Sequence, residues 1–345
     1  MLNYVMNKKT RAAIALSGGV DSSVAALMLK EQGYDVTGVH IQLQASNFDT
    51  SKVVLAEAVA RRIGIPFFLF DLSVLFKAKV IDYCAFELIR GHTPSPCIVC
   101  NRNIKFGELL RLVNEQLGIE YLATGHYARI RIQNDRKFKL LKAKSINKDQ
   151  SYFLHQLTQA QLQHVLFPLG EIQSKDEVRR IAKDAGFPTA QEKDSQDICF
   201  KPPLVQSKPG IISDIKGKVL GEHKGLPFYT VGQREGLGVA IGRPLYVVAM
   251  NVTRNELIVG EKNELGKSEI LVADVNIISG DNSPRTFNAL VKIRSQGKEV
   301  LAKVHLMQDK KACLTALKNP FLSPTPGQFA VFYKGDECFG GGIIS

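Results

Sequence analysis

The chain has 345 residues, and its 45 Lys and Arg against 33 Asp and Glu give a net charge of +12. With 45% hydrophobic and 23% charged residues, the composition excludes a largely disordered, collagen-like or coiled-coil protein, and the length predicts two or three domains. Such a positive balance is frequent in proteins that bind a polyanion, so we expect a nucleic-acid partner; a generally basic proteome is the alternative.

Neither a membrane span nor a secretory signal is expected. The longest stretch without Lys, Arg, Asp or Glu, residues 150–170, contains five Gln and two His. The first residues, MLNYVMNKKTR, have no apolar core and no small-residue cleavage site. Six unevenly spaced cysteines are too few for a disulfide scaffold. We therefore expect a cytoplasmic protein, without a membrane partner, whose thiols are used chemically.

Strand and helix signals alternate through the first half of the chain. Strand-like runs lie at residues 11–16, 35–43, 67–72 and 121–124, and the run at 67–72 reads as a buried strand. Helical spacing occurs at residues 21–29, 52–63, 73–89 and 102–117. This alternation predicts an α/β domain with a parallel sheet covered on both faces, whose ligands bind at the carboxyl ends of the strands.

The amino-acid composition changes near residue 201, where glycines become frequent and β-branched residues dominate. Short strands with turn signals predict two small β-rich, barrel-like domains. We expect domains over residues 1–200, 201–265 and 266–345.

The strongest local signal is the run Ser17–Ser22 (SGGVDS), between the first predicted strand and helix. Glycines without a Cβ let the backbone turn sharply and approach a phosphate, and loop N–H groups, hydroxyls and a helix N-terminus attract an anion. Asp21 is expected either to cap the helix or to hold Mg²⁺ on the phosphates. No GxxxxGK[ST] or GxGxxG motif is present. The loop resembles that of the ATP-pyrophosphatase superfamily, whose members adenylate an oxygen and release pyrophosphate.

Cys97 and Cys100 form a CxxC in a Pro-rich segment, which predicts an extended loop ending where a helix begins. A thiol at a helix N-terminus has a lowered pKa. Cys199 lies about a hundred residues further along. A CxxC alone is a zinc half-site, a redox pair or chance, and no second CxxC completes a Cys₄ zinc site. The remaining cysteines are expected in the core: Cys84, Cys313 and Cys338.

Ordered blocks of the sequence resemble the tRNA-specific 2-thiouridylase family from Arg11 to the C-terminus. They are SGGVDSS (17–23), RRIGIPF (61–67), PCIVCNRNIKFG (96–107), ATGHYAR (123–129), KDQSYFL (148–154), SQDICF (195–200), GxVLGEHxGLxFYTVGQRxGLG (217–238) and PGQFAVFYKGDECFGGGII (326–344). The resemblance implies an adenine nucleotide alpha-hydrolase-like, ATP-binding catalytic domain followed by a central β domain and a C-terminal β-barrel.

The resemblance also implies a mechanism. ATP adenylates the C2 oxygen of the wobble uridine, position 34, of a tRNA. Cys199 carries a persulfide loaded by a sulfur carrier protein, and its terminal sulfur attacks C2. Cys100 is the second thiol and releases the sulfur by a transient disulfide with Cys199. The products are 2-thiouridine, AMP and diphosphate, and the implied substrates are tRNAs such as the Lys, Glu and Gln acceptors.

The residues that the resemblance implies fall into two sets. ATP, with Mg²⁺, is expected against Ala15, Leu16, Ser17, Gly18, Gly19, Val20, Asp21, Ser22, Ile41 and Gly125. The tRNA is expected against Ser95, Pro96, Cys97, His126, Lys148, Asp149, Gln150, Arg294, Ser295 and Gln328.

Three departures from the family pattern leave alternatives open. Cys97 stands where the family usually has an Asp proposed as a general base, so it is a base, a spacer or a ligand. With Cys100 and Cys199 it offers three thiolates to an iron–sulfur cluster, although we prefer the persulfide interpretation. The segments near 44–52 and 200–210 are short, and Arg294-Ser295-Gln296 replaces Arg-Tyr-Arg, so tRNA affinity is expected to differ.

Two other functions compete with the thiouridylase. Another ATP-pyrophosphatase-type ligase would form an amide or amidine bond, but nitrogen transfer does not need the thiol pair. A catalytically impaired tRNA-binding protein would suit the charge and the β domains, but it would not need the intact loop at Ser17–Ser22.

Overall fold

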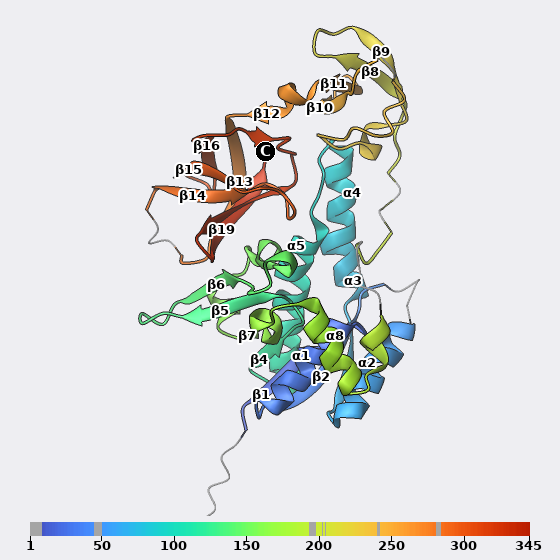
Figure 1. Cartoon of the computed structure of the whole chain (residues 1–345). Coiled ribbons are helices and arrows are strands. Elements are labelled where there is room, and N and C mark those ends of the chain that lie inside the picture. The colour runs from blue at the N-terminus through green and yellow to red at the C-terminus, as the bar shows by residue number, and fades with distance from the viewer. Residues whose placement is uncertain are drawn as a thin grey trace, which may run out of the picture. The chain divides into compact units, whose positions relative to one another are not determined.

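The computed structural model describes residues 9–44, 50–192, 198–201, 203, 205–239, 242–280 and 284–345. The chain divides into two compact units (Figure 1). The first contains residues 1–77 and 100–199, and the second contains residues 78–99 and 200–345. Within the described ranges, no helix combines the length and apolarity needed to cross a membrane. The three domain boundaries expected from the sequence stay predictions.

A parallel five-stranded sheet forms the centre of the first unit. Its strands are β1 (Arg11–Ala15), β2 (Asp35–Gln42), β3 (Phe67–Asp71), β4 (Tyr121–Ala123) and β7 (Val165–Leu166), in the order β3-β2-β1-β4-β7. The α/β prediction is confirmed. Because the strand order reverses between β1 and β4, the loops that follow these two strands leave the sheet at a topological switch point, where ligands bind in such folds.

The helices of the first unit are α1 (Val20–Glu31), α2 (Thr50–Ile63), α3 (Ser73–Phe76), α6 (Leu110–Leu117), α7 (Gln159–Leu162) and α8 (Lys175–Asp184). Helix α1 packs against both α2 and α8. Right-handed crossovers place α1 and α2 on one face of the sheet and the helix preceding β4 on the other. The middle of β1, Ala12 to Ile14, is fully buried, as a central strand covered on both faces requires.

Strand β3 departs from the prediction of a buried strand, which was wrong. Phe68 and Leu69 are 43% and 47% exposed. The strand lies at the edge of the sheet, paired only with β2 among the described strands. An apolar run does not distinguish an edge strand from a central one, because that depends on strand order.

Besides the two-residue β7, two further strands of the first unit were not predicted. Strands β5 (Ala128–Ile132) and β6 (Phe138–Lys142) form an antiparallel hairpin in which Arg131 lies opposite Lys139. The interleaved Arg and Lys hide the alternation that marks a strand. The hairpin interrupts the βα alternation directly after β4.

The second unit begins with helix α4 (Asp82–Ile89), which packs against residues 226–228. Residues 73–89 form a helix as predicted, but residues 77–81 within it are π-helical. The helix α5 (Pro96–Cys100) follows and runs into a π-helical segment, Asn101–Leu109, and then into α6.

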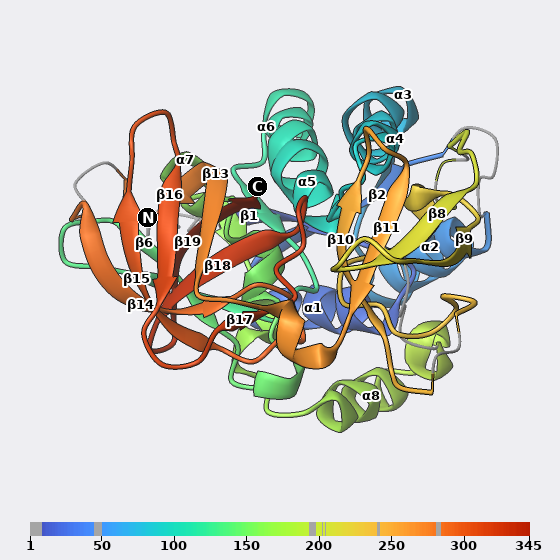
Figure 2. The ribbon, with the colours of Figure 1, turned by 90° about the horizontal axis from the view of Figure 1, so that it is seen from above.

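The rest of the second unit is β structure (Figure 2). A four-stranded sheet has the order β10-β11-β8-β9, from β8 (Gly210–Asp214), β9 (Val219–His223), β10 (Tyr246–Asn251) and β11 (Glu256–Gly260). A six-stranded antiparallel barrel is built from β13 (Glu269–Ile277), β14 (Thr286–Lys292), β15 (Val300–Leu306), β16 (Ala312–Ala316), β18 (Phe329–Lys334) and β19 (Glu337–Ile344). Pairing of β13 with β19 closes it, and β12 (Gly266–Lys267) pairs with β17 (Phe321–Leu322) beside it. The β-rich prediction is confirmed.

Candidate active site

The loop after β1 has a shape that only glycine permits at one position. Gly18 has φ +76°, and a Cβ there would lie 2.5 Å from the Lys52 carbonyl oxygen. Gly19 precedes the first turn of α1, and a Cβ on it would come no closer than 3.4 Å to the Ser17 hydroxyl oxygen. The protein's own packing therefore does not require Gly19, and its missing Cβ leaves space at a helix N-terminus, where an anion binds.

Serine hydroxyls hold this loop in place. The Ser22 hydroxyl accepts the Ser17 N–H at 3.1 Å and lies 3.0 Å from the Gly19 carbonyl oxygen, to which it donates. The Ser23 hydroxyl donates to the same carbonyl at 2.9 Å. Ser22 is buried. The sequence predicts this hydroxyl at the anion, whereas in the structure it is hydrogen-bonded within the loop.

Asp21 does not cap helix α1, so that alternative was wrong. Gly19 is the N-cap residue, and no side chain caps it. The Asp21 carboxylate instead accepts the Tyr127 hydroxyl at 2.6 Å and the Lys175 ammonium at 2.7 Å to each oxygen. The side chain of Lys175 is 11% exposed, so this ion pair is largely shielded from water. Sequence reasoning missed Lys175, which begins helix α8, 154 residues after Asp21.

The loop after β4 lies directly against α1. A Cβ on Gly125 would come within 2.8 Å of the Ser22 amide nitrogen and 2.9 Å of the Asp21 carbonyl carbon. This close approach accounts for the glycine. Gly125 therefore lies beside the Ser17–Ser22 loop, as the switch-point topology requires, and its contact with ATP stays a prediction.

Tyr127 joins the anion loop to the segment Lys148–Gln150. The Gln150 N–H donates to the Tyr127 carbonyl at 2.8 Å, and its side-chain oxygen accepts the Tyr127 N–H at 2.9 Å. Asp149 is an organising residue, because its carboxylate accepts the backbone N–H groups of Ala143 and Ser151 and the Ser151 hydroxyl. Residues expected to contact tRNA are thus one side chain away from Asp21.

The CxxC does not lie in an extended loop, and that prediction was wrong. Helix α5 begins at Pro96, so both cysteines are helical. Proline suits the first turn of a helix, because its φ is preset and no N–H is needed there. Cys97 is exposed in that first turn, and Cys100, three residues on, is 6% exposed.

Lys105 is the second residue that sequence reasoning missed. Desolvation by the surrounding protein raises the pKa of the Cys199 thiol although the residue as a whole is exposed, and the Lys105 charge opposes that rise. Burial also holds the pKa of His126 well below its usual value, and Lys105 lowers it further. Lys105 is half-buried and follows Cys100 by five residues, one turn of the π-helical segment. The matching block at 96–107 contained Lys105, but its charge acquires a role only next to Cys199.

His126 and Cys199 are held by defined partners. The Nδ1 atom of His126 lies 2.7 Å from the Thr124 hydroxyl, and the ring packs against Phe106 and Phe167. With its pKa so low, the imidazole is neutral at pH 7. The Cys199 carbonyl accepts the Gln44 side-chain amide at 2.7 Å, which positions an exposed residue. Residues 195–197 of the matching block lie outside the described residues.

The other residues expected at the tRNA lie in the second unit: Ser95, Pro96, Cys97, Arg294, Ser295 and Gln328. Nη2 of Arg294 lies within 3.0 Å of the Val231 and Ser323 carbonyl oxygens and 2.9 Å from the Thr325 hydroxyl. Arg294 therefore ties two loops together, and its contact with tRNA stays a prediction.

Gln328 lies in the turn that packs against the segment leading to Cys97. The Thr93 N–H donates to the Pro326 carbonyl at 2.8 Å, and a Cβ on Gly327 would lie 2.9 Å from the His92 Cβ. The buried side-chain oxygen of Gln328 has no hydrogen-bond partner among the described residues. An acceptor in this state suits a donor on a ligand.

The cysteines differ in burial. Cys84 and Cys338 are buried, which confirms the core prediction. Cys313, on β16, is only partly buried, so the prediction was wrong for it. Burial, with the charges of Cys97 and Glu87, raises the pKa of Cys84 to about 12. In the part of the chain that the structure describes, no three His, Cys, Asp or Glu side chains gather as metal ligands. The alternative of an iron–sulfur cluster on Cys97, Cys100 and Cys199 stays a prediction.

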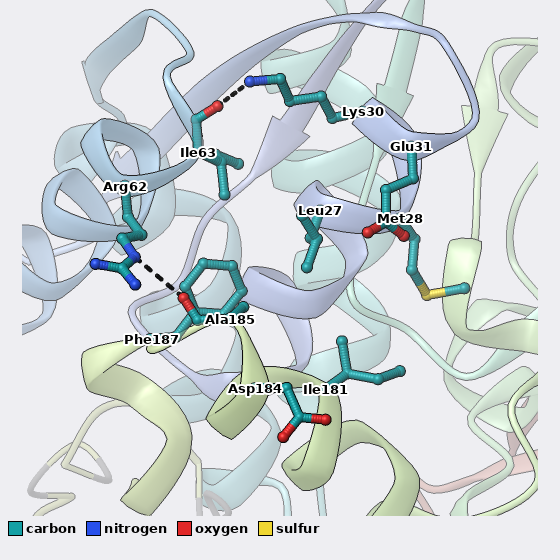
Figure 3. A pocket seen from close by; sticks show the side chains of 10 residues that line it. All are labelled: Leu27, Met28, Lys30, Glu31, Arg62, Ile63, Ile181, Asp184, Ala185 and Phe187. Atoms are coloured by element: carbon teal, nitrogen blue, oxygen red, sulfur yellow. Dashed lines mark hydrogen bonds between the residues drawn. The ribbon is translucent and has the colours of Figure 1, made fainter.

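A cavity of about 730 Å³ opens at the other end of α1 (Figure 3). It is lined by residues at the C-terminal ends of α1, α2 and α8: Leu27, Met28, Lys30, Glu31, Arg62, Ile63, Ile181, Asp184, Ala185 and Phe187. The side chains of Lys30 and Arg62 donate to the carbonyls of Ile63 and Ala185, which are common partners for cations at helix ends. The length of α1, roughly 16 Å, separates this cavity from the anion loop.

Comparison with known proteins gives a consistent result. Three family models match: the tRNA methyl transferase HUP domain over residues 10–203, the tRNA methyl transferase PRC-barrel domain over 202–261 and the aminomethyltransferase beta-barrel domain over 267–344. The tRNA-specific 2-thiouridylase MnmA 1 of Thermoanaerobacter sp. strain X514 is 42% identical over 362 residues, which cover 98% of this chain and 99% of the relative. The tRNA-specific 2-thiouridylase MnmA of Carboxydothermus hydrogenoformans is 41% identical over 97% of this chain and 98% of its own.

Among solved structures, the U34-tRNA thiolase NcsA from Methanococcus maripaludis with its [4Fe-4S] cluster is 18% identical. It covers 55% of this chain and 60% of its own, with a TM-score of 0.36, and no argument rests on a likeness of that size.

Replacing Lys105 by Gln is expected to raise the pKa of Cys199, because it removes the charge that opposes desolvation of the thiolate. The midpoint of the pH profile for alkylation of Cys199 should then move to higher pH. The measurement is iodoacetamide alkylation followed by peptide mass spectrometry, in a Cys97→Ser background that removes the other exposed thiol. The exposed Lys183→Gln is the matched control. An unchanged midpoint would contradict the role of Lys105.

Proposed function

We propose, on the premise that this chain belongs to the tRNA-specific 2-thiouridylase family, that it converts the wobble uridine of tRNA to 2-thiouridine with ATP as the activating substrate. The family membership follows from relatives 41–42% identical over nearly the whole chain. The observation that carries the proposal is that the first unit contains the anion loop, Lys175 and both Cys100 and Cys199. Neither an amide-forming ligase nor a non-catalytic tRNA-binding protein is favoured by this combination.

ATP activates the uridine in the first step. The C2 oxygen of the base attacks the α-phosphorus, the bond from that phosphorus to the β-phosphate bridging oxygen breaks, and diphosphate leaves. The N–H groups of the Ser17–Ser22 loop and the N-terminus of α1 hold the departing phosphates. The space beside Gly19 fits this role.

Lys175 supplies the cation that the loop lacks. The run Ser17–Ser22 contains no lysine or arginine, and Lys175 brings an ammonium group to its edge through Asp21. We propose that Lys175 turns from Asp21 to the phosphates when ATP binds. The carboxylate of Asp21 would then be the side chain that holds Mg²⁺, a hard cation that prefers carboxylate and phosphate oxygens and would neutralise phosphate charge. The Lys175 ammonium would then be paired with a phosphate and the Asp21 carboxylate with Mg²⁺, so neither charge would be left unpaired.

Sulfur transfer follows. The terminal sulfur of a Cys199 persulfide attacks C2, and AMP leaves with the former C2 oxygen. The Cys100 thiolate then attacks the inner sulfur of Cys199, so that the sulfur–sulfur bond to the base breaks and a Cys100–Cys199 disulfide forms. A thiol reductant must reduce this disulfide before the next turnover. The Lys105 charge favours the anionic sulfur at Cys199.

We also propose the sulfur donor, the tRNA substrates and the cellular compartment. The sulfur donor is a persulfide carrier protein, the substrates are tRNAs with a wobble uridine such as the Lys, Glu and Gln acceptors, and the reaction takes place in the cytoplasm. His126, neutral at pH 7, contacts the tRNA by hydrogen bonding and packing rather than by charge. Cys97 acts as a base or as a spacer beside the target base.

Replacing Cys199 by Ser is expected to abolish 2-thiouridine formation and to leave ATP affinity unchanged, because the thiol carries sulfur and does not hold the nucleotide. Thiolation of a tRNA transcript is measured by nucleoside mass spectrometry, and ATP affinity by calorimetry. Cys313→Ser, on the barrel, is the matched control. Thiolation at the wild-type rate by the Cys199 variant would show that sulfur does not pass through this residue.

Replacing Lys175 by Met is expected to slow diphosphate release about 10²–10³-fold, the usual loss when one preorganised charge at a transition state is removed. The tRNA affinity should not change. Lys183→Met, exposed on the same helix, is the control. If Lys175 only neutralises Asp21, removing both charges in the double variant Asp21→Asn/Lys175→Met will restore activity relative to Lys175→Met alone. Such a recovery would refute phosphate binding by Lys175.

Cys97 is tested by two substitutions. If the thiol acts as a base, Cys97→Asp should keep thiolation while Cys97→Ala should lose it and change its pH profile. If the thiol is a spacer, both variants should thiolate like the wild type. A third result would contradict both roles and establish a cluster: the wild-type protein, purified anaerobically, contains iron that Cys97→Ala lacks, and thiolation depends on that iron.

A further inference from the structure

The β5–β6 hairpin concentrates the positive charge of the chain. Residues 128–148 contain eight Lys and Arg and a single acid, Asp135, a net charge of +7 out of +12 for the whole chain. The cations are Arg129, Arg131, Arg136, Lys137, Lys139, Lys142, Lys144 and Lys148. No role assigned above uses the charges between residues 129 and 144.

The register of the hairpin brings like charges together. Arg131 pairs directly with Lys139 across the two strands, an arrangement that destabilises an isolated ladder. Arg136 follows in the turn with φ +63°, a left-handed conformation that glycine or asparagine would adopt at lower cost. The nearby carboxylate of Asp135 accepts the Lys137 backbone N–H, so it shapes the turn. The tip therefore places several cations close to one another.

The hairpin is anchored within the first unit both near its turn, at Phe138, and at its base, at Arg129. The side chain of Gln159 donates to the Phe138 carbonyl at 2.7 Å and accepts the Phe138 N–H at 2.9 Å. Arg129 is 9% exposed, and its Nε donates to the Lys142 carbonyl at 2.7 Å. Because the strands are preorganised, the tip presents its cations without a large cost in conformational entropy on binding.

The two faces of the tip differ. Arg131 and Lys139 share one face by the strand alternation, and Ile132 and Phe138 share the other. Ile132 is 64% exposed, and Phe138 is partly exposed. Cations beside exposed apolar side chains are suited to the phosphates and riboses of an RNA strand.

Both ends of the hairpin join residues that the proposed function places at the tRNA. His126 precedes β5 by two residues, and Lys148–Gln150 follow β6 after a short link. The hairpin is therefore continuous in the chain with the expected substrate surface (Figure 1).

From these observations we propose that the β5–β6 hairpin is an arm that grips the sugar-phosphate backbone of the tRNA through Arg131, Arg136, Lys137 and Lys139. The inference rests on the proposed function, since it takes tRNA as the substrate, and it adds a contact outside the residues expected at the target base. The arm contributes affinity and salt dependence, and it takes no part in the chemistry at C2 or at the α-phosphorus.

The experiment removes the charge of the arm and measures the salt dependence of tRNA binding. The arm variant is Arg131→Gln/Arg136→Gln/Lys139→Gln, and the matched control removes three exposed cations from α2 and α8: Arg61→Gln/Arg180→Gln/Lys183→Gln. Dissociation constants for a tRNA transcript are measured between 50 and 200 mM salt, with ATP affinity and thermal unfolding recorded for each protein.

The arm variant should reduce the slope of log affinity against log salt by about 2 to 3, because each lost phosphate contact removes about 0.7–0.9. The control should keep the wild-type slope, and both should bind ATP like the wild type. An arm variant with the wild-type slope, or a control with the same loss, would overturn the inference. Normal tRNA binding combined with slower sulfur delivery from a persulfide carrier would overturn it in favour of a protein partner.

Failure of the proposed function would be recognised from the tRNA binding and thiolation of the wild type. If the wild type binds tRNA but forms no 2-thiouridine, the thiouridylase proposal fails while the slopes still decide whether the arm binds RNA. If the wild type does not bind tRNA, both proposals fail.

Discussion

The ion pair between Asp21 and Lys175, with the Tyr127 hydroxyl on the same carboxylate, is the interaction on which the site depends. It joins the first turn of α1, the loop after β4 and the start of α8, three segments that are far apart in the chain. The Lys175 side chain is nearly buried, so the attraction is screened less than at the surface, and removal of one partner would leave a poorly solvated charge. This pairing places a cation and a carboxylate beside the Ser17–Ser22 loop, where the proposed function assigns them to the nucleotide phosphates and to Mg²⁺.

The same interaction couples two parts of the proposed reaction. Tyr127 bonds Asp21 through its hydroxyl and Gln150 through both of its backbone groups, so movement of Asp21 toward a metal ion bears directly on the segment expected to contact tRNA. The strand order makes this possible, because β1 and β4 are neighbours and their following loops meet at the switch point. Because Gly125 has no Cβ, the loop after β4 can lie in contact with the backbone of Asp21 and Ser22.

The thiols depend on a different constraint, the helical start at Pro96. It exposes Cys97 in the first turn and buries Cys100 one turn later. The π-helical segment that follows contains Lys105, whose charge lowers the pKa of both Cys199 and His126. One ammonium group thus opposes the desolvation of a sulfur nucleophile and helps to keep an imidazole neutral. π-Helical segments are frequent at functional sites because they shift side chains from the face that an α-helix would give them.

The sequence by itself determined the elements whose signals are local: the glycine loop between the first strand and helix, the alternation that gives a parallel sheet, the β-rich second half and the thiols in their blocks. It could not show that β3 lies at a sheet edge, because a run of apolar residues is the same in a central strand. Pro96 is compatible with both a loop and a first helical turn, and packing selected the helix. The alternating Arg and Lys of β5 and β6 hid a hairpin whose register pairs like charges. Lys175 reaches Asp21 across 154 residues, and Lys105 gains its role from the placement of Cys199; such pairings are decided only by the tertiary structure, because electrostatic partners are chosen by distance in space and not along the chain.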